Sequence, residues 1–180
     1  MSSFDVLLCK SEKLRNGYVE SLETADVYFS MKWLDHFSYI PVFFEEIYNV
    51  CNGTRRDISE QIFFDFLPGY RLMQVDEILD SYEQTFKNLS EYDKIIPFLT
   101  DYSGSYYAYA VNKGKECIVL YDKEGTIELM HSKINDFWDT MVAFYDENVY
   151  FLDEDGYLSY DYEREGDIGK KYNKGISYWG

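Results

Sequence analysis

The stretch that decides the fold runs from residue 106 to residue 130 and reads YYAYAVNKGKECIVLYDKEGTIELM. Residues 106–111 and 117–121 are rich in aromatic and β-branched residues, and NKGK separates them, which is typical of a hairpin. The segment DKEG at 122–125 then predicts a turn into a third strand over 126–130. The stretch therefore predicts an antiparallel β-meander.

Helices are predicted on both sides of the meander, because apolar residues recur there at intervals of three and four. The predicted ranges are 22–37, 41–52, 75–86 and 133–145. Pro41 suits the first helical position, and Gly53 suits the left-handed residue that closes a helix. Ser132 is expected to be the N-cap of the last helix.

A second hairpin is predicted near the end of the chain, with arms at 149–152 and 157–162. The residues DEDG at 153–156 resemble part of a calcium loop, but Tyr162 stands where a glutamate closes such a loop. An Asp-Gly hairpin turn is the better interpretation. The glycine- and lysine-containing tail after Glu163 is expected to be loosely ordered.

The order of these elements predicts an α+β fold. Helices come first, then an antiparallel β-meander sheet, then a helix and a hairpin, so we expect the sheet to pack against several helices. The 180 residues contain no internal repeat, linker or low-complexity tract, and this length suits one domain over 1–180.

The charge of the chain restricts its partners. Seventeen Lys and Arg stand against 33 Asp and Glu, which gives a net charge of −16. Such a field repels phosphate backbones and anionic lipid headgroups, so we expect no nucleic acid and no membrane, and it favours basic partners. Solubility alone is the simpler explanation of the same charge.

The cysteines and histidines predict neither a disulfide framework nor a metal site. Cys9, Cys51 and Cys117 form no CxxC, and there are only two histidines, so a zinc site is not expected. The start of the chain does not resemble a signal peptide, and no apolar stretch reaches the ~20 residues of a membrane helix. We expect a cytoplasmic protein without metal or cofactor.

No group of residues stands out as a catalytic site. His131 precedes Ser132, but Ser132 is better explained as a helix cap, and adjacency in sequence does not make a triad. The many acidic residues offer many carboxylate pairs, and none is distinguished from the others. We therefore expect no enzyme, with a carboxylate-dependent hydrolase as an open alternative.

Tyrosines gather at the start of the meander. Tyr102, Tyr106, Tyr107 and Tyr109 lie near Asp101 in the sequence, and tyrosine is enriched at binding hot spots. Strand alternation places Tyr107 and Tyr109 on one face and Tyr106 on the other. Some of these rings are therefore expected outside the core unless both faces of the sheet are covered.

Four short motifs follow one another between residues 40 and 145. They consist of Ile40, Pro41, Phe44, Tyr48, Asn52 and Gly53; of Phe66, Tyr70, Leu72, Val75, Glu77 and Ile78; of Ile96, Pro97, Phe98, Asp101, Ser103, Gly104 and Tyr107; and of Ser132, Ile134, Phe137 and Trp138. Their order and spacing resemble those of the SUKH superfamily, the Smi/Knr-like proteins. Residues 1–39 and 148–180 lie outside the resemblance, and the usual Ser or Pro before the helix at Val75 is missing.

The resemblance implies an α+β fold and, in bacteria, an immunity protein that binds and neutralises a toxin, often a nuclease, without a cofactor. Related fungal proteins act as regulatory hubs. A nuclease that grips phosphates is expected to be basic, which suits an acidic inhibitor that occludes it, acting as a monomer or weak dimer. A regulatory or scaffolding module of the same fold stays an alternative. The expected partner-binding residues are Asp65, Asp101, Tyr102, Tyr106, Tyr107 and Asp122.

Overall fold

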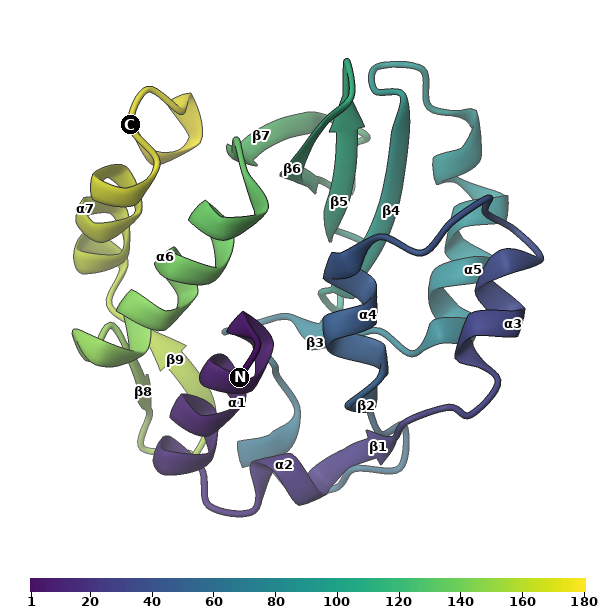
Figure 1. The fold of residues 1–180 in the computed structure, drawn as a ribbon. Coiled ribbons are helices and arrows are strands. Elements are labelled where there is room, and N and C mark those ends of the chain that lie inside the picture. Colours follow the sequence, from purple (N-terminus) through teal and green to yellow (C-terminus); the bar gives the residue numbers. More distant parts are fainter.

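A five-stranded antiparallel sheet forms the centre of the computed structural model, which describes residues 1–180 (Figure 1). Its strands, in spatial and sequence order, are β3 (Arg71–Leu72), β4 (Lys94–Thr100), β5 (Tyr106–Asn112), β6 (Lys115–Tyr121) and β7 (Ile127–His131). The predicted meander is confirmed as β5, β6 and β7, and the fold is α+β as expected.

Seven helices and two small ribbons surround this sheet. The helices are α1 (Ser3–Leu14), α2 (Tyr18–Ser21), α3 (Phe29–Leu34), α4 (Val42–Tyr48), α5 (Val75–Gln84), α6 (Ile134–Asp146) and α7 (Tyr162–Tyr172). One ribbon pairs β1 (Leu22–Thr24) with β2 (Cys51–Thr54), and the other pairs β8 (Tyr150–Leu152) with β9 (Leu158–Tyr160). None of the helices is long and apolar enough to cross a bilayer.

One face of the sheet packs against α4 and α6 through aromatic rings. Phe43 of α4 lies 4.8 Å from Phe98 of β4 and 5.3 Å from Trp138 of α6, measured between ring centroids. Burial of each such ring contributes about 1.5–3 kcal/mol to folding. The resulting core holds 37 buried residues and extends from Phe4 to Trp179, so both ends of the chain contribute to it.

The opposite face of the sheet carries a smaller core. Ala108, Ala110 and Val119 belong to it, and Phe86 covers them from the single 3₁₀ turn that follows α5. Both faces are therefore covered in part. The predicted alternation holds, since Tyr109 belongs to the large core whereas Ala108 belongs to the small one.

The predicted helix over 22–37 is wrong over residues 22–28, and α3 ends at Leu34. Leu22–Thr24 forms β1, which pairs with Cys51–Thr54 far along the chain, and this pairing replaces the local helical bonds. The carboxylate of Asp26 then accepts the backbone N–H of Tyr28 at 2.8 Å, which forms a turn before α3 begins. The stripe of aromatic residues correctly indicated α3 but not its start.

The predicted helix over 41–52 is also too long, because it ends at Tyr48 and Gly53 lies in β2 instead of closing the helix. Gly53 has a φ of +81°, and a Cβ there would lie 2.6 Å from the carbonyl oxygen of Met73. Glycine is needed at this position so that β2 can approach the backbone that leads into α5. Pro41 precedes the helix as its N-cap residue.

We expect Gly53→Ala to destabilise the fold by about 3 kcal/mol, because it adds a clash to an unfavourable φ. The matched control is Gly114→Ala, which has a φ of +73° but no neighbour within 4 Å. The control should cost only about 1 kcal/mol. Urea unfolding measures both values, and equal losses would show that the close approach is unimportant.

The ends of α5 and α6 differ from expectation by one or two residues. α5 stops at Gln84. Its start is capped by other groups than the expected Ser or Pro, since Asn52 accepts the N–H of Val75 at 3.0 Å and Glu77 accepts that of Gln74 at 2.9 Å. Ser132 is not the N-cap of α6, because Lys133 occupies that position.

The second hairpin is confirmed as β8 and β9. The carboxylate of Asp153 accepts the N–H groups of Asp155 and Tyr157 at 3.0 and 2.9 Å, so it closes a hairpin turn. The second arm is shorter than predicted, since α7 begins at Tyr162 with Asp161 as its N-cap. A polar side chain directly after the strand therefore starts a helix.

The tail after β9 is ordered, in contrast to the expectation. Trp179 is buried, and its indole N–H donates to the carbonyl oxygen of Met130 at 2.7 Å. A Cβ on Gly169 would lie 2.0 Å from the Trp179 ring, so the absence of a side chain there allows the ring to pack on α7. His131 of β7 contacts the carbonyl oxygen of the Asn173 side chain at 2.7 Å, which fixes the end of α7 on the sheet.

The contribution of His131 to the stability of the fold should fall as the pH falls from about 6.5 to about 4. Burial lowers the pKa of His131 to about 4, so between these values the unfolded chain binds a proton that the folded chain excludes. The His131→Gln variant should lose this dependence, which reaches about 1.4 kcal/mol per pH unit. Urea unfolding at several pH values tests this, and an unchanged slope in the variant would contradict it.

Candidate functional site

Four of the six predicted partner-binding residues follow or begin strands at one end of the central sheet. Asp101 and Tyr102 follow β4, Tyr106 begins β5, and Asp122 follows β6. In the register of the sheet, Tyr106 lies opposite both Thr100 and Tyr121. Antiparallel neighbours meet in this way because the end of one strand lies beside the start of the next.

Asp101 organises the loop between β4 and β5. Its carboxylate accepts the backbone N–H groups of Ser103, Gly104 and Ser105 at 2.7–2.8 Å, and the hydroxyl of Ser103 at 2.6 Å. Desolvation raises the pKa of Asp101, but these hydrogen bonds outweigh it and hold the pKa below its usual value. Asp101 therefore remains ionised while it fixes the loop that presents Tyr102.

Tyr102 and Asp65 are in direct contact. Tyr102 is 69% exposed, yet its hydroxyl donates to the carboxylate of Asp65 at 3.0 Å. Asp65 is buried, accepts the N–H of Gly69 at 2.9 Å, and has a pKa raised by burial. The Tyr102 ring is thus held in place on the surface, which reduces the entropy lost when a partner covers it.

The other three predicted residues have different environments. Tyr107 is buried, and its ring lies edge-on to that of Tyr70 at 4.7 Å, so the expectation that Tyr107 contacts a partner is corrected to a supporting role. Tyr106 is half-buried against Phe86. Asp122 accepts backbone N–H groups in the turn between β6 and β7, where it is a structural residue like Asp101.

The second hairpin and α7 add residues that the sequence did not indicate. Burial raises the pKa of Tyr70 to about 12, and the nearby Asp101 and Tyr160 raise it further. Burial also raises the pKa of Tyr178, with further contributions from Glu165, Tyr70 and Tyr160. These groups are therefore neighbours in space, although they come from distant parts of the chain.

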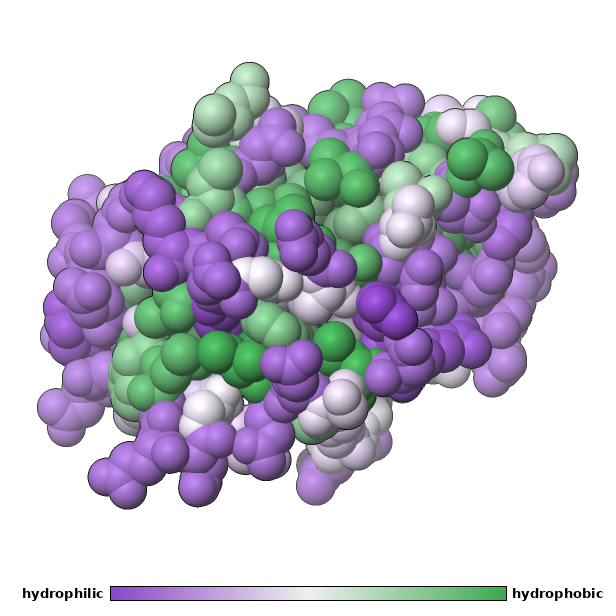
Figure 2. All heavy atoms as spheres, turned by 90° about the horizontal axis from the view of Figure 1, so that it is seen from below, coloured by the Kyte–Doolittle hydropathy of each residue, from purple (hydrophilic) through white to green (hydrophobic).

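We name this surface the aromatic–acidic face. It consists of Tyr70, Asp101, Tyr102, Tyr157, Tyr160, Glu165 and Tyr178. The ring of Tyr157 lies 6.4 Å from that of Phe64, next to Asp65, which brings the hairpin to the end of the sheet. Figure 2 shows the molecule from below the view of Figure 1, the side on which α2 and β1 lie, and apolar residues there lie among hydrophilic ones.

Glu165 is the unusual carboxyl group of this face. It lines a hollow of about 460 Å³ together with Tyr162, Glu163, Asp167 and Tyr178, and its carboxyl group has neither a hydrogen bond nor an ion pair. Burial raises the pKa of Glu165 to about 7. A cationic group placed in this hollow would lower that pKa and favour the charged form.

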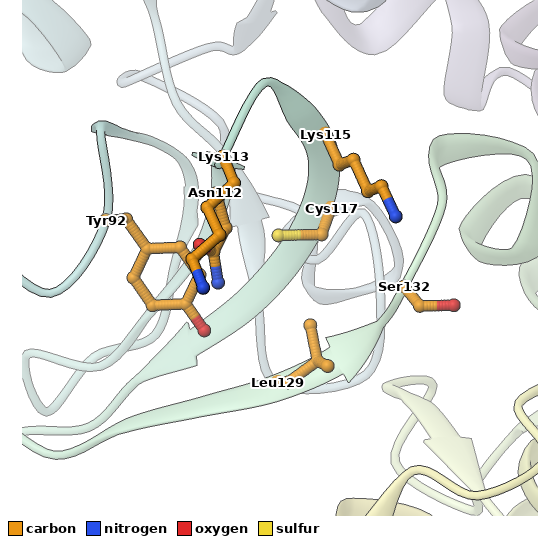
Figure 3. A pocket seen from close by; sticks show the side chains of 7 residues that line it. All are labelled: Tyr92, Asn112, Lys113, Lys115, Cys117, Leu129 and Ser132. Atoms are coloured by element: carbon orange, nitrogen blue, oxygen red, sulfur yellow. The ribbon is translucent and has the colours of Figure 1, made fainter.

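Cys117 and His131 lie in environments that are unsuited to nucleophilic catalysis. A hollow of about 260 Å³ over the small core is lined by Tyr92, Lys115 and Cys117, and the sulfur of Cys117 is turned away from Ser132 (Figure 3). Burial raises the pKa of the Cys117 thiol to about 11, so the thiol stays protonated at neutral pH. His131, which precedes Ser132, is buried in the large core next to Trp179.

No three side chains of His, Cys, Asp or Glu are grouped so that they could hold a metal ion. Comparison of the chain with models of known protein families and with characterised proteins gives no match.

We expect Glu165→Gln to stabilise the protein at pH 8 by on the order of 1 kcal/mol. Because the pKa of Glu165 rises from 4.5 to about 7 on folding, the folded chain binds the extra proton between these values, and stability falls as the pH rises through them. Thermal unfolding at pH 4.5 and pH 8 compares the variant with Glu163→Gln, which removes a neighbouring exposed charge. An equal gain in stability at pH 8 in both variants would contradict the raised pKa of Glu165.

Proposed function

We propose that this protein is an immunity protein of SUKH type, which binds a basic toxin and blocks its active surface. The observation that carries the proposal is the aromatic–acidic face, which combines the exposed rings of Tyr102, Tyr157 and Tyr160 with the ionised Asp101. Tyrosines of this kind act as anchors at protein interfaces, because they combine a large apolar ring with a polar tip.

The charge of the chain supports a basic partner. A net charge of −16 accelerates association with a positively charged surface at low ionic strength. A nuclease that holds nucleic acid phosphates carries such a surface. An acidic inhibitor can therefore occupy the place of the phosphates, while the tyrosines slow dissociation.

The rigidity of the face also supports binding. Tyr102 is fixed by Asp65, and the loop before β5 is fixed by Asp101. A partner that covers this face would find the rings already placed, so less conformational entropy is lost on association. The same argument holds for a regulatory or scaffolding module, which differs in its partner and not in its surface.

A carboxylate-dependent hydrolase is the second candidate, and the observation that favours it is Glu165. A carboxyl with a pKa of about 7 suits a general acid. Turnover of a substrate by the purified protein, abolished in Glu165→Gln, would favour this function over the first.

The proposed function is tested by co-expression with the toxin encoded beside this chain. Cells should survive with the wild type and lose protection with the double variant Tyr102→Ser, Tyr160→Ser, which should also weaken binding by about tenfold or more, since each hot-spot ring contributes at least about 1 kcal/mol. The control is Tyr28→Ser, at a tyrosine before α3 whose exposure lies between those of Tyr102 and Tyr160. Killing that is the same with and without the wild-type protein would refute the proposal.

A further inference from the structure

Three of the five arginines of the chain line one hollow of about 340 Å³ beside Tyr102. Arg55 and Arg56 directly follow β2, and Arg71 lies in β3. The two strands are joined where the backbone N–H of Leu72 donates to the hydroxyl of Thr54 at 3.1 Å. In a chain with a net charge of −16, this gathering of guanidinium groups is not explained by composition.

The arginines are only partly neutralised by carboxylates. Arg71 makes two hydrogen bonds of 2.9 Å to Glu77, and Arg55 makes two to Asp57 at 2.9 and 2.7 Å. The guanidinium of Arg56 has no hydrogen bond, and its Nε lies 3.8 Å from the same Glu77. Three positive groups therefore face two negative groups, and the side chain of Arg56, which is 65% exposed, has donors to spare.

The rest of the lining is suited to an apolar group. Ile58, Phe64 and Tyr102 line the hollow together with the arginines. Ligand sites commonly combine such an apolar wall with a few polar groups that fix orientation. A guanidinium matches the geometry of a carboxylate or phosphate, because its planar fork donates two parallel hydrogen bonds.

We propose that this hollow binds an oxyanion carried on an aromatic or apolar group. The oxyanion is held by Arg56 with support from Arg55, and the apolar group lies against Phe64 and Ile58. Both a carboxylate and a phosphate monoester have the required chemistry. The proposal depends on the arginines and not on a toxin partner, so the site can exist whether or not the protein is an immunity protein.

The position of Tyr102 connects the two surfaces. Its ring lines the hollow, and its hydroxyl is bound to Asp65 of the segment that supports the aromatic–acidic face. A ligand in the hollow therefore lies at the border of the proposed partner surface. A protein partner that covers Tyr102 would also contact the positively charged arginines of the hollow. We therefore expect the partner to carry an acidic residue at the position that faces them.

The test is a titration of the purified full chain with phenyl phosphate, phenylacetate and inorganic phosphate. Binding is followed by NMR through the arginine Nε–H resonances and the backbone amide of Tyr102. We expect saturable shifts at Arg56 and Tyr102, with the better phenyl compound binding at least about threefold more tightly than inorganic phosphate because of the apolar wall. Tighter binding of phenyl phosphate assigns a phosphate monoester, and tighter binding of phenylacetate assigns a carboxylate.

Two variants separate a specific site from charge attraction. Arg56→Gln should weaken binding by about tenfold, because it removes the free fork while the exposed position leaves the fold intact. Lys123→Gln, in the exposed turn between β6 and β7, removes the same charge elsewhere and should leave the affinity unchanged. Absence of saturable shifts with all three probes, or equal weakening in both variants, would overturn the proposal.

Discussion

The packing around Phe43 is the interaction on which the structure depends. This ring contacts Phe98 and Tyr109 of the sheet and Phe137 and Trp138 of α6, with centroid distances between 4.8 and 6.1 Å. A helix from the first half of the chain and a helix from the last third are thereby joined on one face of the sheet. The ends of the strands, which carry the candidate site, are placed by this packing.

Some acidic residues stabilise turns in addition to contributing to the net charge. Asp101, Asp122 and Asp153 each bind the backbone N–H groups of a turn, and the three turns connect successive antiparallel strands. The pKa values of Asp101 and Asp122 are lowered, because hydrogen bonds to the ionised carboxylate stabilise that form. The carboxylates that a basic partner would contact therefore also hold the loops of the acidic surface in place.

The elements that the sequence predicts well are those with local signals. The meander and α6 follow from periodicity and turn residues, whereas the ribbon of β1 and β2 depends on pairing between Leu22 and Thr54, which no local pattern shows. α1 was not predicted, although Ser2 and Asp5 have the spacing of a capping box and form it in the structure. The order of the tail depends on the contact between Gly169 and Trp179, which becomes visible only in three dimensions.

The distinction between local sequence signals and long-range packing also applies to the candidate site. The sequence proposes Asp101 and Tyr102 because they cluster beside a predicted strand, and it does not reveal the burial of Tyr107 because alternation alone does not tell which faces of the sheet are covered. Tyr160, Glu165 and Tyr178 were missed, since their place beside Tyr70 depends on how the last hairpin and α7 pack against the sheet. The local pattern therefore predicts only those residues of the candidate face that are close together in the sequence.

The most direct test of a partner on this face is hydrogen–deuterium exchange of the protein alone and bound to the toxin encoded beside it. The account predicts that binding slows exchange of backbone amides in residues 101–106 and 157–165, which come from separate parts of the chain. Protection confined to α3 and α5, which carry none of the residues of the aromatic–acidic face, would contradict it.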